Sequence, residues 1–337
     1  MDDIDLILYT VESKFRKNKK QFSGTEIDIK WSFLIRRAMN NRILYVFVKS
    51  IINNGMSIEK NEKALEICKK GDHWLNKFNK TLRIVEKYFG HSNYSVIKTF
   101  KYFQDITFDI DIIVLDKNSD ILFKTIEHLC LNEKFILSKI KGGYELKPSN
   151  EDEYLVIDIY TDFLHGKNTI ISTDFVFNKS NDYKYLNKKY LTPSFEAELL
   201  LYISQINFQN RFITLHDFLQ VIGLICTGLD WDKLLEEVSD NNWKDSFIET
   251  ISIIHGLYAI NYGTKLNIPI KANLKIKNTF PYFLGFFSSM KYDHELCGNY
   301  KNISQNLRYS YYKFLSYNLR HRLPIYRDWM DIDLVKE

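Results

Sequence analysis

The spacing of hydrophobic positions changes twice along the chain and divides it into three parts. Apolar residues first recur at helical spacing over 29–54 and 58–89. Short apolar or alternating runs then predict strands, and helical spacing returns from Pro193. We therefore expect three regions: an N-terminal helical region over 1–90, an αβ core over 91–180 and a C-terminal helical domain over 190–337.

The middle region combines short strands with one helix. The helix is predicted over 121–131, and the segments FILSKIK and GGYELKP predict a hairpin around Gly142 and Gly143. Further strands are predicted over 94–100, 108–115, 154–160 and 169–177. The expected fold class is α+β, with a small mixed sheet that is preceded and followed in the sequence by helical regions.

The C-terminal region begins with a well-marked helix start. Ser194 precedes the segment FEAELLLYISQI, and Glu196 and Glu198 in the first turns interact favourably with the helix dipole. Thr214 is a candidate cap for the next helix, which Gly228 ends. Further helices are predicted over DWDKLLEEVSD, 243–262 and about 300–322.

Composition narrows the class of protein. The 46 basic and 42 acidic residues leave a net charge of +4, which is too balanced to require a nucleic-acid partner. The four cysteines form no CxxC pair, which excludes a zinc finger or a disulfide framework. The opening MDDIDLILYTVESKF lacks the features of a signal peptide, and no stretch reaches the roughly 18 apolar residues of a membrane span. We expect a cytoplasmic protein without a membrane partner.

Two aspartates mark the candidate chemistry. Asp109 and Asp111 lie two residues apart on a predicted strand, so both side chains point to the same face. Carboxylates this close repel each other, and the cost rises as they are buried. A divalent cation removes this cost, and Mg²⁺ or Mn²⁺ prefers such oxygen ligands. The alternative is a surface strand with acidic outer residues, since an isolated DxD pattern also arises by chance.

A third aspartate lies in a later apolar run. Asp158 is flanked by Ile157 and Ile159, where a carboxylate without a partner is costly. If its strand lies beside that of Asp109 and Asp111, it completes a set of three carboxylates. Such a set can hold two metal ions around an in-line displacement at phosphorus.

These segments resemble a known family. IKTF at 97–100, DIDI at 109–112 and IDI at 157–159 resemble the turn and two acidic strands of the DNA polymerase β-type nucleotidyltransferase superfamily. The flanking helices resemble those of a bacterial and archaeal nucleotidyltransferase group, and the similarity covers most of 30–262. It is carried by the segments at 36–51, 194–205, 212–225 and 229–238.

The resemblance implies a role for each residue. Asp109 and Asp111 would bind the metals, while Asp158 would bind the catalytic metal and act as base toward the acceptor hydroxyl. Lys98 and Thr99 would hold the phosphates of a nucleoside triphosphate. The implied reaction moves a nucleoside monophosphate to a hydroxyl of a small molecule, a protein side chain or an RNA end.

One departure keeps a second function open. The family turn usually contains glycine, which lets backbone amides approach the triphosphate, whereas Lys98 and Thr99 stand here. A degraded turn fits a pseudoenzyme that binds a nucleotide without turnover, or a partner in a toxin–antitoxin or defence pair.

The remaining candidates carry weaker signals. Asp217 is expected at a cap or on an exposed helix face, although it could line the cleft, and His165 and Lys167 are expected in a hairpin loop. His294 and Cys297 lack further zinc ligands, and no P-loop is present. The C-terminal helix could grip a nucleic-acid strand or could bury its aromatic side; it carries Arg308, Lys313, Arg320, Arg322 and Arg327 among tyrosines.

Overall fold

The structure is a computed structural model, and it describes most of the chain up to residue 269. The predicted helix over 300–322, His294, Cys297 and Lys167 lie outside the described residues, and so does Thr214. The described residues are 38, 44–53, 62–90, 93–100, 109–115, 119–140, 142–165, 168–178, 180–210, 213, 215–262 and 265–269.

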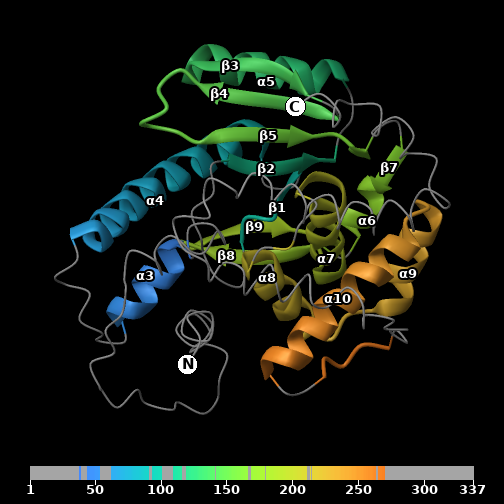
Figure 1. The fold of residues 1–337 in the computed structure, drawn as a ribbon. Coiled ribbons are helices and arrows are strands. Elements are labelled where there is room, and N and C mark those ends of the chain that lie inside the picture. The colour runs from blue at the N-terminus through green and yellow to red at the C-terminus, as the bar shows by residue number, and fades with distance from the viewer. Residues whose placement is uncertain are drawn as a thin grey trace, which may run out of the picture.

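A five-stranded mixed sheet forms the centre of the molecule (Figure 1). Its strand order is β1-β2-β5-β4-β3; β2 and β5 run parallel, and every other neighbouring pair is antiparallel. The sheet, together with the helices around it, confirms the α+β class. The strands are β1 (Tyr94–Ile97), β2 (Asp109–Val114), β3 (Phe135–Ile140), β4 (Gly143–Pro148) and β5 (Val156–Tyr160).

The β3–β4 hairpin lies where the sequence predicts it. Ile140 pairs with Gly143 at its tight end, and Gly142 takes the left-handed conformation with φ of 74°. Gly143 is required by close packing, because a Cβ there would lie 1.9 Å from the carbonyl oxygen of Ile159 on β5.

One face of the sheet is covered by α4 (Glu62–Phe89) and α5 (Ser119–Glu133). Alternate residues of β2 and β5 point into this layer and are fully buried. They are Ile110, Ile112, Ile157 and Ile159, and they share a cluster with Leu82, Val85, Ile126 and Leu129 of the two helices. The N-terminal region therefore packs onto the sheet through α4; the predicted boundaries at 90 and 180 stay predictions.

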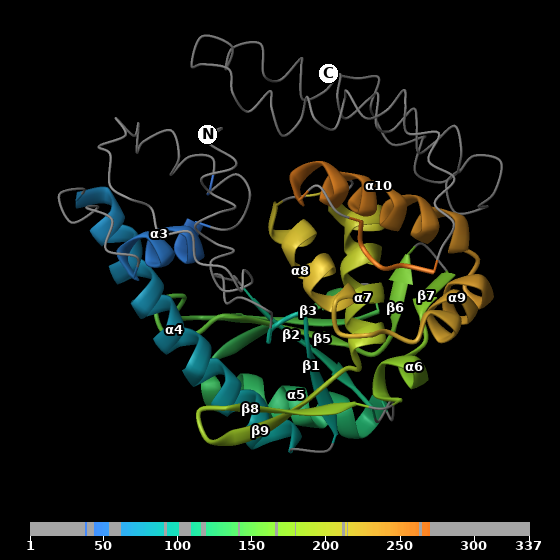
Figure 2. The same ribbon diagram turned by 90° about the horizontal axis from the view of Figure 1, so that it is seen from below.

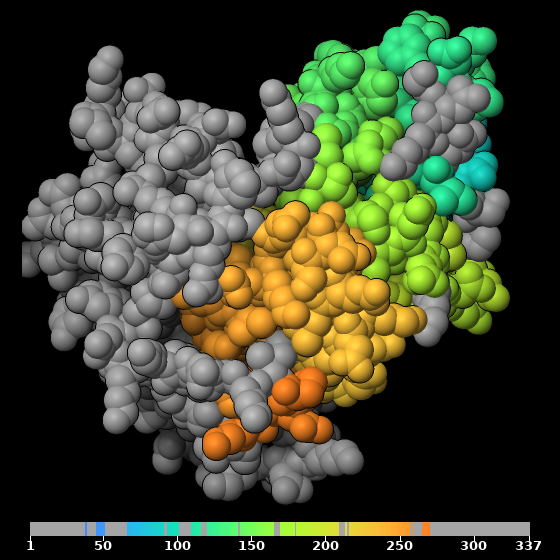
Figure 3. Space-filling view, turned by 90° about the vertical axis from the view of Figure 1, so that its right-hand side faces the viewer, coloured from blue at the N-terminus to red at the C-terminus, as the bar shows by residue number. Residues whose placement is uncertain are grey.

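The opposite face lies beneath the later helices (Figure 2). Ile97 and Ile113 point from the sheet into this second buried cluster. In Figure 3 the orange surface of α9 and α10 abuts the yellow-green surface of the segment before α7. The layer contains α7 (Phe195–Ser204), the π-helix η1 (Gln205–Asn210), α8 (Leu215–Ile225), α9 (Trp231–Asp240) and α10 (Lys244–Tyr262).

The predicted strand over 169–177 is wrong in its second half. The chain forms the hairpin of β6 (Phe163–His165) and β7 (Asn168–Ile171), and then the short helix α6 (Thr173–Phe177). Ser172 caps this helix, since its hydroxyl oxygen accepts from the Phe175 N–H at 3.2 Å. An apolar run this short does not distinguish strand from helix, and the cap decides the outcome.

A second hairpin has no counterpart among the sequence predictions. β8 (Asn181–Tyr185) pairs with β9 (Lys188–Thr192) through a turn at Leu186 and Asn187, whose φ angles are 45° and 65°. Two left-handed residues suit a hairpin turn, but without glycine the turn leaves little trace in the sequence.

The predicted helices before and after the sheet are confirmed where they are described. The helix α3 (Leu44–Asn53) packs on α4, which covers most of the predicted 58–89 helix. Ser194 caps α7 by accepting from the Ala197 N–H at 3.2 Å. Within the described residues, no helix has the length and apolar character needed to cross a membrane.

Candidate metal centre

The structure brings the three predicted aspartates together. Asp109 and Asp111 project from the same face of β2, and Asp158 on β5 is the direct neighbour of Asp111 in the parallel register. One carboxylate oxygen from each residue can be chosen so that all three lie within 4.8 Å of one another. Among the described residues, this is the one group of at least three His, Cys, Asp or Glu side chains found so close together.

The cluster lies in a partly buried position within the fold, with Asp109 and Asp158 of intermediate exposure. Strand β2 has a neighbour on each side, and Ile113 on the same face enters the core beneath the helices. The Asp111 side chain is only 12% exposed. The alternative of a surface strand with acidic outer residues is therefore not what the structure shows.

Asp158 carries an electrostatic cost. Burial, followed by repulsion from Asp111, Asp109 and Glu145, raises the pKa of Asp158 to about 7. Its buried Oδ1 has no hydrogen-bond partner among the described residues. A buried oxygen without a donor is unfavourable, so this position suits an added cation.

A divalent cation fits the donor set on two grounds. All three side chains offer carboxylate oxygens, which are the ligands that Mg²⁺ and Mn²⁺ prefer. In addition, the buried Oδ1 of Asp158 accepts no hydrogen bond from the described residues, so this oxygen can bind the cation without losing a protein partner. Asp109, Asp111 and Asp158 are thus the residues that could hold the metal.

Lys98 lies directly beside the cluster. Its Nζ is 2.9 Å from Asp111 Oδ2, and both side chains are almost buried, at 13% and 12% exposure. Burial alone would lower the pKa of Lys98, but the attraction of Asp111, together with Asp109 and Glu198, outweighs it and raises the pKa. Lys98 therefore remains a cation and compensates part of the acidic charge.

The backbone of Lys98 has the conformation that glycine favours. Its φ is 54°, in the left-handed region, at the turn where the family resemblance predicts glycine. Helix α7 binds this peptide on both sides: the Lys98 N–H donates to Glu198 Oε1 at 3.0 Å, and the Tyr202 hydroxyl donates to the Lys98 carbonyl at 3.3 Å. These contacts offset a left-handed cost of about 1–2 kcal/mol.

Thr99 differs from the expectation. Its hydroxyl is buried and donates to the carbonyl of Ile97 at 3.0 Å. A phosphate contact through the Thr99 hydroxyl would require this bond to break, so that contact stays a prediction.

Sequence reasoning missed three side chains around the acids. Glu198 and Tyr202 hold the Lys98 peptide, and Tyr160 on β5 forms a hydrogen bond with Asp111. Burial and the nearby carboxylates raise the pKa of Tyr160, so its hydroxyl stays protonated and donates to Asp111. The i,i+4 spacing of Glu198 and Tyr202 was a usable signal, because it places both on one face of α7.

The other sequence candidates are not members of the aspartate cluster, although the charge of Asp217 acts on Tyr202, which holds the Lys98 peptide. Asp217 was predicted to cap a helix or to lie on an exposed helix face. The prediction of exposure is wrong, because Asp217 is buried in the first turn of α8. The Nδ1 atom of His216 is 3.7 Å from the Asp217 carboxylate oxygen Oδ1. The hairpin predicted around His165 is confirmed, but His165 itself ends strand β6 and pairs with Asn168 instead of lying in the loop. The described cysteines Cys68, Cys130 and Cys226 form no disulfide.

Comparison with known proteins assigns no family: no protein-family model and no curated protein matches the chain. The likeness to nucleotidyltransferases therefore depends on the residues and geometry described above.

Proposed function

We propose that this protein is a Mg²⁺- or Mn²⁺-dependent nucleotidyltransferase that moves a nucleoside monophosphate from a nucleoside triphosphate to a hydroxyl acceptor. The observation that carries the proposal is the convergence of Asp109, Asp111 and Asp158 from two parallel strands, with one oxygen left without a donor. Lys98 beside them adds a cation that can bind phosphate.

The three aspartates would hold the metal, and each side chain nearby has a task. When bound, the metal supplies positive charge to the triphosphate and acidifies the acceptor hydroxyl. Lys98, held by α7, aims its ammonium at the same space and would bind a phosphate oxygen as a point charge. Tyr160 keeps Asp111 oriented through its hydroxyl.

The chemical step balances with the groups present. The acceptor oxygen forms a bond to the α-phosphorus while the bond from that phosphorus to the pyrophosphate oxygen breaks. The hydroxyl proton passes to a carboxylate oxygen of Asp158, which acts as general base. Pyrophosphate leaves on the side opposite the acceptor, as an in-line displacement requires.

A second function has its own support. The ion pair of Lys98 with Asp111 already neutralises part of the cluster, and the Thr99 hydroxyl is turned to its own backbone. Both features suit a protein that binds a nucleotide without transferring it.

Radiolabelled substrate tests the proposal. The full chain is incubated with α-labelled nucleoside triphosphates, Mg²⁺ or Mn²⁺ and hydroxyl acceptors of each class, and label transfer is measured alongside pyrophosphate release. Asp111→Asn should lose transfer by about 10²- to 10³-fold, the range for removing one preorganised electrostatic group. Asp240→Asn on α9, which removes an exposed carboxylate, is the matched control.

The outcomes separate the two functions. Metal-dependent nucleotide binding without transfer supports the non-catalytic binder. If nucleotide binding does not depend on a metal and Asp111→Asn behaves like Asp240→Asn, both functions are rejected.

A further inference from the structure

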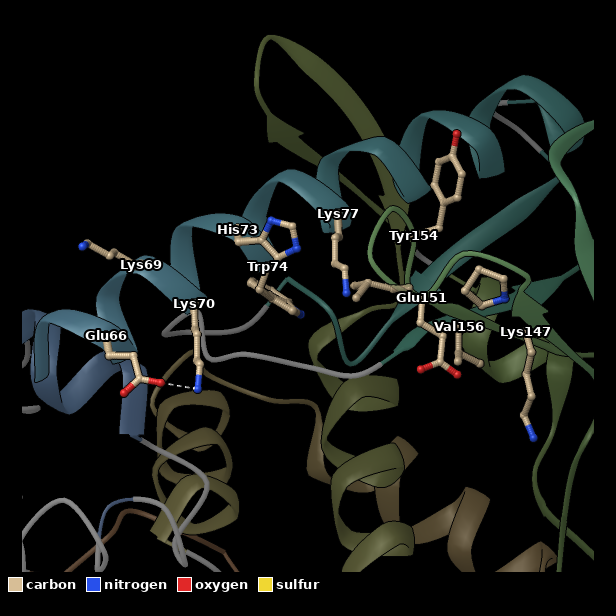
Figure 4. A pocket seen from close by; sticks show the side chains of 12 residues that line it. Glu66, Lys69, Lys70, His73, Trp74, Lys77, Lys147, Glu151, Tyr154 and Val156 are labelled. Atoms are coloured by element: carbon tan, nitrogen blue, oxygen red, sulfur yellow. Dashed lines mark ion pairs between the residues drawn. The ribbon is translucent and has the colours of Figure 1, made fainter. Parts of the chain in front are cut away.

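A groove of about 580 Å³ lies at the end of the sheet where β2 and β5 begin. It is lined by α4 on one side and by the β4–β5 region on the other (Figure 4). Val156 in its wall is the register neighbour of Asp109, and Lys147 lies two residues after Glu145, the register neighbour of Asp158. The groove therefore adjoins the aspartate cluster.

The wall of the groove is mainly basic. Four lysines line it, against two glutamates; Lys70 is paired with Glu66 at 2.6 Å, and Lys147 is paired with Glu145 at 2.9 Å. Within the described part of the chain, no acidic side chain forms an ion pair with Lys69 or Lys77. Such a wall favours an anionic ligand.

An aromatic ring accompanies these cations. Trp74 is half-buried, stacks on Phe78 with a ring-centre distance of 5.2 Å and contributes to the groove wall. Figure 4 shows Lys70, Trp74 and Lys77 extending from the same side of α4. Their span is about 10 Å of helix at 1.5 Å per residue, which is longer than a single phosphate group.

We propose that this groove binds the single-stranded end of a nucleic acid, whose terminal hydroxyl is the acceptor of the transfer. Lysines that follow a phosphate backbone, together with an aromatic wall for a base, are the features that bind single strands. The inference rests on the proposed function, because it names the acceptor class for the same aspartates.

The strand order supports the assignment of acceptor rather than triphosphate. Lys98 follows β1, on one side of β2, whereas the strand wall of the groove is formed by the start of β5 and the end of β4, on the other side of β2. The aspartates lie between them. Since an in-line displacement places acceptor and pyrophosphate on opposite sides of the phosphorus, a triphosphate held by Lys98 leaves the groove side to the acceptor.

Strand binding is tested with the full chain in the absence of nucleotide and metal. Fluorescence anisotropy measures the dissociation constant for a labelled single-stranded oligoribonucleotide, and for the oligodeoxyribonucleotide of the same sequence, over a series of salt concentrations. Lys77→Ala and Lys147→Ala should each reduce the slope of log Kd against log salt by about 0.7. Lys124→Ala on α5 removes an exposed lysine that does not line the groove and should leave the slope unchanged.

Trp74 tests the aromatic contact separately. Trp74→Ala should weaken binding by about 5- to 100-fold with the same salt slope, whereas Trp74→Phe keeps a stacking ring and most of the affinity. Circular dichroism of each variant identifies a loss of folding, and the phenylalanine variant keeps the test valid if the alanine variant does not fold.

The results distinguish failure of this inference from failure of the proposed function. Loss of strand binding in the lysine variants, with metal-dependent nucleotide binding intact, supports the groove as the strand site. If the wild type binds both the strand and the nucleotide but transfers nothing, the proposed function fails and the groove remains a strand-binding site. Loss of nucleotide binding with strand binding unchanged would assign the groove to the triphosphate and overturn the inference. It is also overturned if Lys77→Ala matches Lys124→Ala, or if an acidic peptide competes as well as the strand.

Discussion

The two faces of β2 and β5 differ completely although they share the same backbone. Ile110, Ile112, Ile157 and Ile159 on one face are fully buried against α4 and α5. The residues between them place three aspartates on the other face. The alternation of side chains along each strand places a stabilising core on one face and a site with unfavourable charge on the other. Because the three carboxylates repel each other, the buried core must supply the stability that the site lacks.

Truncation on the apolar face should have the largest effect on stability. Ile157→Ala removes a fully buried side chain and should lower the free energy of unfolding by about 2–5 kcal/mol, whereas Ile157→Val should lower it by about 0.5–1.5 kcal/mol. Urea unfolding followed by circular dichroism measures both values. Equal effects of the two variants would show that this face is not tightly packed.

Neutralising the acidic face should act in the opposite direction. Because the pKa of Asp158 is raised to about 7, the metal-free folded protein keeps a proton there that the unfolded chain loses near pH 4. The contribution of the protonated Asp158 side chain to the free energy of unfolding is present at low pH and is lost as pH rises through about 7. Asp158→Asn removes this loss.

Unfolding in a chelator at two pH values checks the sign. At pH 8 Asp158→Asn should be more stable than the wild type by about 2 kcal/mol, after allowance for solvent screening of a side chain that is not fully enclosed. At pH 4 the two proteins should be nearly equal. A variant that is less stable than the wild type at pH 8 would contradict the repulsion among the aspartates.

A divalent cation should reduce the repulsion among the aspartates, so that the acidic face no longer destabilises the folded state. Mg²⁺ at ten times its dissociation constant should stabilise the wild type by about 1.4 kcal/mol, because it binds the folded state alone. Thermal unfolding with Mg²⁺ and with chelator measures the shift. Asp111→Asn should show none, while Asp240→Asn should keep it; an equal shift in both variants would place the ion elsewhere.

The smallest expected effect concerns the turn beside the acidic face. Since Lys98 has φ of 54°, Lys98→Gly should be more stable than Lys98→Ala by about 1 kcal/mol, although both lose the ammonium. The comparison isolates backbone strain from charge, and chemical unfolding measures it. Equal stability would mean that the turn relaxes once the lysine side chain is removed.

The sequence by itself determined the local order of the molecule. Alternation in DIDIIV and VIDIY predicted both strands and put Asp109 and Asp111 on one face, and Ser194 marked the start of α7. These features depend on interactions between residues a few positions apart, which short-range sterics and hydrogen bonds control. The Leu186–Asn187 turn and the Ser172 cap were local as well, but their residue types carry weaker preferences.

Tertiary structure decided how these pieces became a site. Asp158 meets Asp111 because β5 inserts between β2 and β4 in a particular register, and burial of the apolar face sets that register. Lys98 holds a left-handed turn through Glu198, a residue 100 positions later. The burial of Asp217 and the formation of the basic groove both depend on the packing of helices and strands that are distant in the sequence. Contacts across such separations depend on the area that the whole fold buries, which no local pattern records.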